Sequence, residues 1–486
     1  MFFSHIIRSS IIVFGLFCAA CVQTQIPTNA PDERHCEDAA DAAVLADSHC
    51  HAVTVPLSYD ERDGEQISLF VRTFPALKER RGAVLLLAGG PGESGASFYA
   101  DIAFFRDVFE HYELIIPDHR GTGYSSKLCE PEETPASEGG LNLVGEEWGT
   151  CFGQLYAAID RTHAFNLENA AQDIATIIES LKLGDETYVY GVSYGTSLAL
   201  AVAERTQANL TGIILDSLTP LPSDDQESLG YRSQITDQIG QQVLERCAAE
   251  PSCPLGSDAV QVYTNLLKRI DAGETIAGLD AVPNRDLRQL LGQLLDVPSA
   301  RGQIPSIIAA MVAGDDTAEA RIGLAIETFE TFLAPIVAFN QATASIPLTS
   351  LMSGSEFNTR KNLTSEQVAA EKTDLLFTSP LPNYLAIGQF PLYEPSILES
   401  PRTDLPPLLV LHGTLDPKTT YEGALRRVEV LRGLTDVHVV TLVDAPHAAY
   451  LTSQDCLRTP LRAFIADDEV LQTTDCQSES VSLKWE

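Results

Sequence analysis

Short apolar runs alternate with amphipathic segments along most of the chain. Six runs rich in Val, Ile and Leu each end in a glycine-rich or acidic turn, as buried parallel strands do. Between the second and third runs, four apolar residues share one helical face of segment 166–184, with Gly184 at the C′ position. This alternation predicts an α/β fold with a mostly parallel central sheet flanked by helices. The six runs are 84–87, 114–116, 188–190, 213–215, 408–411 and 437–443.

The pattern changes between residues 217 and 405. Apolar residues recur there at helical spacing, over 287–295 and again over 304–312, and strand-like runs are scarce. We expect a largely helical cap, 217–405, inserted between late strands of the sheet. A separate binding domain is the other interpretation that this pattern allows. The flanking parts, 22–216 and 406–486, would then form the two halves of the core.

The first 21 residues have the order of a secretory signal. Arg8 precedes the apolar run 11–17, which is too short to span a bilayer, and two alanines follow. Segment 16–21, Leu-Phe-Cys-Ala-Ala-Cys, resembles a bacterial lipoprotein box with Cys21 as the acylated residue, although cleavage without acylation stays open. The leader therefore predicts an exported protein, which would lie in the bacterial periplasm or cell envelope or be secreted. Any membrane attachment would be made through a lipid on Cys21.

Eight of the ten cysteines follow this leader. An even number in an exported chain indicates disulfides, and their clustering along the sequence favours nearest-neighbour pairs. Metal binding through His35-Cys36 and His49-Cys50-His51 is the competing interpretation, and no other zinc-like spacing occurs. The predicted pairs are Cys36 with Cys50, Cys129 with Cys151, Cys247 with Cys253, and Cys456 with Cys476.

The excess of acidic residues indicates which ligands the protein would repel and which it would attract. The chain has 486 residues, of which 44% are hydrophobic, and 32 Lys and Arg stand against 67 Asp and Glu, a net charge of −35. Such a charge repels nucleic-acid phosphates and anionic lipid headgroups, so it disfavours nucleic-acid binding. It attracts cationic ligands weakly, and peptides with free amino termini are among these.

A glycine-flanked serine provides the first chemical signal. Segment 191–195, Gly-Val-Ser-Tyr-Gly, follows the strand-like run 188–190 and opens a small-residue helix over 196–204. In a nucleophile elbow the serine occupies a tight strand-to-helix turn, where side chains at the flanking positions would collide. Ser193 is therefore the predicted nucleophile.

A serine hydroxyl needs a base and an acid that orients the base. Asp416 lies just past the run 408–411, and His447 lies just past the run 437–443. The order Ser, Asp, His is that of α/β hydrolases. Asp444 is the alternative acid, but it stands only three residues before the histidine.

A glycine-rich loop follows the first apolar run. The oxyanion of an acyl-transfer reaction needs two N–H donors. We expect these from the backbones of Tyr194 and Gly90, because glycines let the main chain approach the substrate. Segment 90–95 also satisfies the dinucleotide pattern G-x-G-x-x-G, with Asp118 at a suitable distance, but Pro91 removes an N–H and Glu93 would repel a pyrophosphate.

Taken together, five motifs resemble the proline iminopeptidase and tripeptidyl aminopeptidase family of serine exopeptidases. Ala88 replaces a histidine common in proline iminopeptidases, which makes the exported tripeptidyl aminopeptidase branch the more similar one. The resemblance implies an α/β-hydrolase core, a helical cap between late strands, and release of residues or short peptides from free amino termini. The motifs are 88–92 (Ala-Gly-Gly-Pro-Gly), 118–125 (Asp-His-Arg-Gly-Thr-Gly-Tyr-Ser), 191–195, the Asp416 turn and 445–447 (Ala-Pro-His).

The expected activity needs no cofactor and no metal. An aminopeptidase must neutralise the ammonium group of its substrate, and Glu93 is the best placed carboxylate for this role. Acids of the expected cap are the alternatives, but no motif matches them to the amine-binding residues of the family, and we expect most of them to be solvated surface charges. These acids are Asp224, Asp225, Glu227, Glu327 and Glu330. We interpret Asp118 and Arg120 as a structural pair that braces the neighbouring loop. Two other functions share these residues: a carboxylesterase or lipase with the same triad, and a catalytically silent surface-binding lipoprotein. The sequence gives no indication of the oligomeric state.

Overall fold

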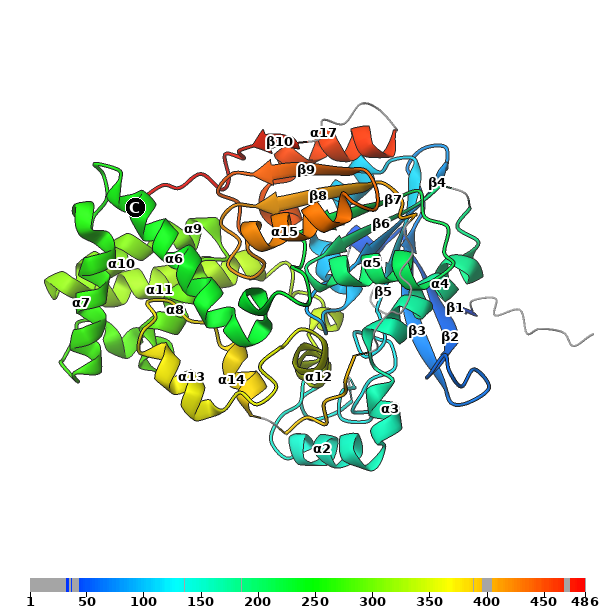
Figure 1. Cartoon of the computed structure of the whole chain (residues 1–486), viewed down its shortest axis with the longest axis horizontal. Coiled ribbons are helices and arrows are strands. Elements are labelled where there is room, and N and C mark those ends of the chain that lie inside the picture. The colour runs from blue at the N-terminus through cyan, green and yellow to red at the C-terminus, as the bar shows by residue number, and fades with distance from the viewer. Residues whose placement is uncertain are drawn as a thin grey trace, which may run out of the picture.

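A mixed sheet forms the centre of the part of the chain that the structure describes. This computed structural model describes residues 32–34, 36, 43–134, 136–184, 186–387, 389–395, 404–466 and 473–485, so the expected leader and Cys21 lie outside it. The strand order is β1-β2-β3-β5-β4-β6-β7-β8-β9-β10 (Figure 1). The strands are β1 (Asp32–Arg34), β2 (His49–Pro56), β3 (Gln66–Phe74), β4 (Gly82–Leu87), β5 (Tyr112–Pro117), β6 (Glu186–Val192), β7 (Gly212–Asp216), β8 (Leu408–Gly413), β9 (Val437–Leu442) and β10 (Thr473–Cys476).

The six predicted apolar runs fall on β4 to β9, which confirms the α/β architecture. From β5 to β10 every neighbouring pair is parallel, and β4, β7 and β8 are buried along their whole length. The sequence interpretation missed β1 to β3, which pair antiparallel, and β10. Strand β2 is only partly buried, so it lacks the continuous apolar run by which buried strands are recognised.

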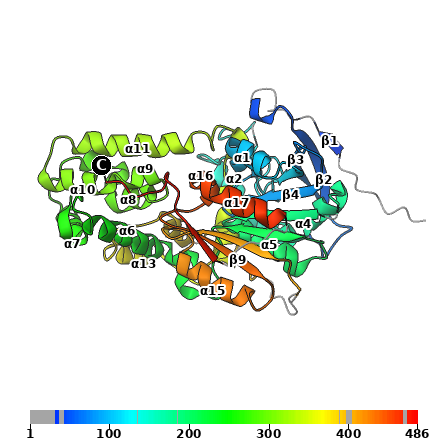
Figure 2. The same ribbon diagram turned by 90° about the horizontal axis from the view of Figure 1, so that it is seen from above.

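Helices cover both faces of the sheet (Figure 2). One face packs against α1 (Ile102–Val108), α16 (Ala449–Thr452) and α17 (Gln454–Ile465). The other face packs against α4 (Leu167–Leu181), α5 (Tyr194–Arg205) and α15 (Tyr421–Leu431).

The predicted helix 166–184 corresponds to α4. It begins after Asn166, whose side chain accepts a hydrogen bond from Asn169 N. The expectation for its other end was wrong. The helix ends at Leu181, and Lys182 takes the left-handed conformation at φ 51°, so Gly184 lies one position beyond C′. A lysine in this conformation bears backbone strain that a glycine would have avoided.

Every element that the structure describes between Asp216 and Leu408 is helical. Helices α6 to α11 pack around one apolar cluster, which the C-terminal residues Leu483 and Trp485 also contact. Helix α12 instead contributes Leu348 and Leu351 to the core cluster under α4 and α5. The helices are α6 (Arg232–Ala248), α7 (Ala259–Asp271), α8 (Leu287–Leu294), α9 (Pro298–Arg301), α10 (Ile304–Ala313), α11 (Ala318–Leu333), α12 (Ile346–Glu356), α13 (Ser365–Lys372) and α14 (Leu381–Ala386), and α2 (Glu147–Ala157) and α3 (Ile159–His163) precede α4.

The four disulfides join the nearest-neighbour pairs that the sequence predicts. Cys36 and Cys50, the two cysteines of the alternative metal site, are bonded to each other, so neither has a free thiolate to bind a metal ion. Among the described residues, no group of three or more His, Cys, Asp or Glu side chains is arranged to hold a metal ion. The same residues include no helix that is long and apolar enough to cross a membrane.

Candidate active site

Ser193 lies in a strained turn between β6 and α5. Its backbone has φ 54° and ψ −122°, and its N–H donates to the Asp216 carbonyl oxygen at 2.9 Å. A Cβ atom on Gly191 would lie 2.2 Å from the Gly195 carbonyl oxygen, and one on Gly195 would lie 2.2 Å from the Leu87 carbonyl oxygen. Both flanking glycines are therefore sterically required, as the elbow interpretation expects.

Asp416 and His447 meet at the carboxyl ends of β8 and β9. His447 Nδ1 lies 2.7 Å from Asp416 Oδ2, and both side chains are buried. The two residues are 31 positions apart in sequence, yet parallel neighbouring strands deliver their following loops to the same edge of the sheet. The structure thus brings together the acid and base that the sequence predicts.

The Asp416 carboxylate is held in the ionised state. Burial alone would raise its pKa, but attraction to His447 and the hydrogen bond from its ring outweigh burial and hold the pKa well below the usual range. The amides of Lys418 and Thr419 also donate to Oδ1, at 2.8 and 2.9 Å. An ionised carboxylate here favours a proton on His447 Nδ1, which leaves Nε2 able to accept one.

Thr419 and His412 support this carboxylate, and the sequence interpretation gave neither a role in the site. Thr419 Oγ1 donates to Asp416 Oδ2 at 2.8 Å, and His412 Nε2 lies 2.9 Å from the Thr419 carbonyl oxygen. Burial, the largest influence, lowers the pKa of His412. The signal for Thr419 was available: a hydroxyl residue three positions after an aspartate in a Pro-containing turn is a common local partner of that aspartate.

The loop that carries His447 is tied to the end of β7. Asp216 accepts hydrogen bonds from the amides of Ala449 and Tyr450, at 2.8 and 3.0 Å. Ser217 Oγ accepts one from the Ala448 amide at 2.8 Å. These bonds fix the backbone next to the imidazole, so the ring is positioned by residues that lie more than 200 positions earlier in the chain.

Asp444, the alternative acid, is engaged elsewhere. Its carboxylate forms an ion pair with Arg246 of α6 and accepts a hydrogen bond from Gln477 Nε2 at 3.0 Å. The geometry therefore favours Asp416 as the partner of His447.

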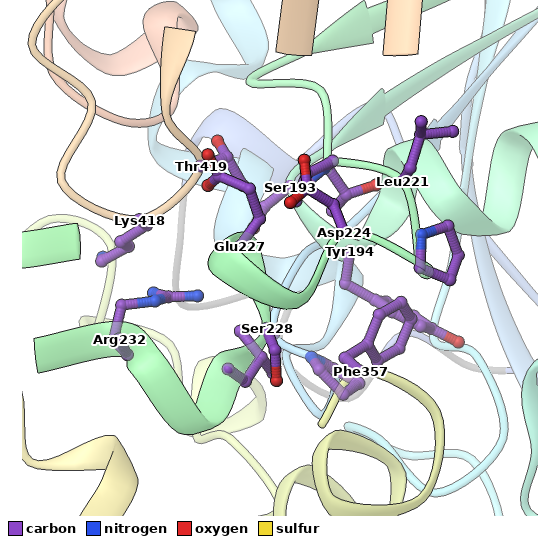
Figure 3. A pocket seen from close by; sticks show the side chains of 16 residues that line it. Ser193, Tyr194, Leu221, Asp224, Glu227, Ser228, Arg232, Phe357, Lys418 and Thr419 are labelled. Atoms are coloured by element: carbon purple, nitrogen blue, oxygen red, sulfur yellow. The ribbon is translucent and has the colours of Figure 1, made fainter. Parts of the chain in front are cut away.

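Two cavities meet at Ser193. The large cavity has a volume of about 720 Å³ and is lined by Ser193, His447, Glu93 and apolar residues of α11 and the segment after it. The small cavity, about 50 Å³, is lined by Ser193, Asp224 and Glu227, among others (Figure 3). The serine thus stands where a substrate could extend in two directions.

The backbone amides of Gly90 and Tyr194 border the same space. Gly90 has φ +108°, a conformation that disfavours any residue with a Cβ, and it lines both cavities. Tyr194 is the first residue of α5, so its N–H has no acceptor within the helix. Neither amide donates to any other described residue, as the predicted oxyanion donors require.

Helix α12 of the insertion holds the loop that carries Gly90. Thr349 Oγ1 lies 2.5 Å from the Pro91 carbonyl oxygen, and the Ser345 amide donates to the Gly92 carbonyl oxygen at 2.9 Å. A Cβ atom on Gly92 would lie 2.3 Å from Thr349 Oγ1. Gly92 is therefore needed for this close contact.

The same contacts oppose the dinucleotide interpretation of this loop. Gly92 faces the α12 residues, and a Cβ atom on Gly95 would lie 2.6 Å from a methyl group of Ile116. The Asp118 carboxylate accepts hydrogen bonds from the amides of Gly95 and Tyr124, at 2.9 and 2.8 Å. The glycines and the acid of the pattern are thus engaged by the protein itself.

The interpretation of Asp118 and Arg120 as a mutual pair was wrong. Arg120 forms a buried ion pair with Asp173 of α4 at 2.7 Å and donates to the Leu57 and Ala164 carbonyl oxygens. Because Asp118 lacks a salt-bridge partner among the residues described, burial raises its pKa to about 6. Both residues do brace loops, but different ones.

Four charged residues line the small cavity. Sequence reasoning named Asp224 and Glu227 only as alternatives for the amine site and gave Arg232 and Lys418 no role. Asp224 and Glu227 both pair with Arg426, at 2.7 and 2.8 Å. Lys418 pairs with Asp296 at 3.2 Å. The remaining charge belongs to Arg232. Glu93, the expected amine-binding residue, is exposed and lines the large cavity instead.

The strand order, the elbow and the acid–base pair define the class of α/β hydrolases, and the chain has that fold. Residues 82–293 match the family model described as alpha/beta hydrolase fold, and residues 391–476 match the model described as TAP-like protein.

Three curated relatives align with the chain at similar identity. Serine protease Hip1 of Mycobacterium tuberculosis is 28% identical over 250 residues, 45% of each chain. Carboxylesterase B of the same species is 29% identical over 244 residues, 46% of each chain. Tripeptidyl aminopeptidase of Streptomyces lividans is 28% identical over 224 residues, 41% of this chain and 40% of that one. The chain spans less than half the length of each of these relatives.

Proposed function

We propose that this protein is an exported serine peptidase that releases residues or short peptides from free amino termini. The observation that supports it is that Ser193 lines two cavities: the large cavity is also lined by His447, whose ring is paired with the buried Asp416, and the small cavity is also lined by the buried carboxylate of Glu227. Relatives named as a serine protease and a tripeptidyl aminopeptidase support the peptide class. The leader and the four disulfides support export.

In the proposed mechanism Ser193 attacks the scissile carbonyl while His447 takes its proton. Asp416 stabilises the imidazolium, and the amides of Gly90 and Tyr194 stabilise the oxyanion. The protonated His447 then gives its proton to the leaving amine, and water, activated by the same imidazole, releases the acyl group from Ser193. Each step uses groups that lie around the two cavities.

Glu227 is the carboxylate that we propose for the substrate ammonium. Its Oε1 accepts hydrogen bonds from Thr420 Oγ1 and Arg426, at 2.5 and 2.8 Å. Its Oε2 is buried and has no partner among the described residues. Arg426 is shared with Asp224, so these three groups have one more acid than base, and Arg232 and Lys418 are the other cations that line this cavity. The substrate ammonium is the cation that we propose for the free oxygen of Glu227.

The Glu227→Gln variant tests this role. We expect kcat/KM for a peptide with a free amino terminus to fall about 10- to 100-fold, since a hydrogen bond between charged groups is worth about 1.5–3 kcal/mol. The amino-acetylated peptide should be cleaved poorly by the wild type and changed little by the substitution. Glu93→Gln, made in parallel, compares the other candidate. A tenfold loss in Glu93→Gln alone would move the amine site to the large cavity.

The competing function is a carboxylesterase, favoured by the apolar lining of the large cavity by Phe329, Phe332 and Leu333. Paired assays of aminoacyl and tripeptidyl amides against short acyl esters separate the two. Turnover of amides supports the peptidase, and turnover of esters without amides excludes it. A mass-spectrometric digest of a peptide library then gives the length of the released fragment.

Thr349 should act as a positioning residue for the loop at Gly90. In Thr349→Val the Pro91 carbonyl oxygen loses this hydroxyl, and we expect kcat to fall about tenfold with KM little changed, because the oxyanion donor moves while ground-state contacts remain. Thr349→Ser keeps the hydroxyl and should retain wild-type kcat. Steady-state kinetics of the three proteins measure this, and equal kcat in the valine variant would exclude the role.

A further inference from the structure

Arg232 places a cation inside the cleft, and no residue that the structure describes pairs with it. It is the first residue of α6 and lines both the large and the small cavity, together with Ser193. Its guanidinium forms no hydrogen bond or ion pair with any residue that the structure describes, and its Nε atom is fully buried. Figure 3 shows the side chain extending from the helix into the small cavity.

The acids around Arg232 have other partners, although Glu227 Oε2 has none among the described residues. Asp416, Asp296 and Glu227 are the charges that act on it most strongly. They are hydrogen-bonded or paired with His447, Lys418 and Arg426, respectively, at 2.7, 3.2 and 2.8 Å.

A cation at this place carries two energetic costs. Burial, the largest influence, lowers the pKa of Arg232, although a guanidinium stays charged in water at any ordinary pH. The first turn of a helix such as α6 also favours an anion over a cation, because the helix dipole is positive at that end. Both costs would be relieved by an anion bound in the cavity.

From these observations we propose that Arg232 forms a carboxylate-binding subsite, so that the enzyme prefers substrates with a carboxylate close to the scissile bond. The guanidinium can hold a carboxylate through two parallel hydrogen bonds, whereas Lys418 is already held by Asp296. Combined with Glu227, the cleft would present one acceptor for an ammonium and one donor for a carboxylate. The inference specifies the substrate of the proposed peptidase. It depends on the proposed function where the substrate is a peptide, but not where the substrate is an ester.

The carboxylate could come from an acidic side chain or from the C-terminus of a short peptide. Peptide pairs that exchange Glu for Gln next to the cleaved bond test the first source, and peptides with a free or an amidated C-terminus test the second. Aryl monoesters of a dicarboxylic acid make the same comparison without an amide bond. Each is compared with the same aryl ester whose second carboxylate is blocked as a methyl ester. We expect the carboxylate member of at least one pair to have a kcat/KM about 10- to 100-fold higher.

Variants of Arg232 assign the preference to this residue. Arg232→Gln should reduce the preference to less than about threefold, mainly by slowing the carboxylate member, while Arg232→Lys should retain part of it because a point charge replaces a planar donor. Lys418→Gln is the matched control: it removes another cation of the same cavities and should leave the preference in place. Calorimetric binding of the same pairs to Ser193→Ala gives the comparison without turnover.

The inference fails if the wild type shows no carboxylate preference in any pair, in turnover or in binding, or if Lys418→Gln removes the preference as fully as Arg232→Gln. The two proposals fail separately. If the ester pair is discriminated through Arg232 and no peptide is cleaved, the subsite stands and the peptidase is excluded. If peptides are cleaved without regard to the carboxylate, the peptidase stands and the subsite is excluded.

Discussion

Replacing Ser193 with alanine should lower kcat by about five to six orders of magnitude. Loss of the nucleophile in a serine peptidase typically removes nearly all of the contribution of the triad, because the three residues act as one unit. Labelling by a fluorophosphonate probe should disappear at the same time. Alanine has no greater conflict than serine with φ 54°, so the fold should persist and the melting temperature should change by less than about 2 °C.

Ser197 is the matched control for this experiment. It lies one helical turn further along α5, is buried, and shares a hydrogen bond of 2.6 Å with Thr219. Ser197→Ala should keep kcat within about tenfold of the wild type and should still be labelled. Fluorophosphonate labelling that persists in Ser193→Ala, or activity within tenfold of the wild type, would contradict the assignment of the nucleophile.

Replacing Asp416 with asparagine should lower kcat by about 10⁴-fold with the geometry unchanged. Two backbone amides donate to Oδ1, so the asparagine oxygen must stay at that position. The amide NH₂ would then occupy the place of Oδ2 and face His447 Nδ1. A donor there forces Nδ1 to accept and leaves the proton on Nε2, and that tautomer cannot take a proton from Ser193.

The Asp444→Asn variant tests whether the alternative acid contributes to catalysis. Asp444 is the second aspartate near His447 in sequence, but its carboxylate pairs with Arg246. Its substitution should alter kcat by less than about tenfold while lowering stability modestly, since a partly exposed partner limits the strength of the ion pair. Kinetics and thermal unfolding of both variants check this. A greater loss of kcat in Asp444→Asn than in Asp416→Asn would reverse the assignment of the acid.

Several features of the fold could be read from local patterns. Fully buried strands such as β4 and β8 need continuous apolar runs, and an elbow serine needs glycines at both flanking positions, so both leave marks in neighbouring residues. The strands β2 and β3 were missed for different reasons: β2 is only partly buried, whereas β3 has an apolar run, 69–71, that is as long as the run 114–116 but was not recognised. In the sheet β2 pairs with β1 and β3, and β3 joins the parallel strands through β5.

The charged groups of the cleft show why other features could not be read. Glu227 and Asp224 look like ordinary surface acids in sequence, and Arg426 lies about 200 positions away from both. Only folding brings them together and leaves Glu227 Oε2 and the Arg232 guanidinium without partners in the described part of the chain. The error over Asp118 and Arg120 has the same origin: closeness in sequence suggested a pair, whereas Arg120 reaches Asp173, 53 positions further on.

By itself, the sequence determined the α/β class and the pairing of the cysteines, because each follows from spacing along the chain, and it predicted Ser193, Asp416 and His447 as candidate catalytic residues. Tertiary structure decided which acid lies against the imidazole, which helix holds the loop at Gly90, and which charges of the cleft remain unpaired. Those outcomes depend on distances between segments that the sheet and the inserted helices bring together. No local pattern encodes such distances, since they are fixed only when the apolar clusters on both faces of the sheet are packed.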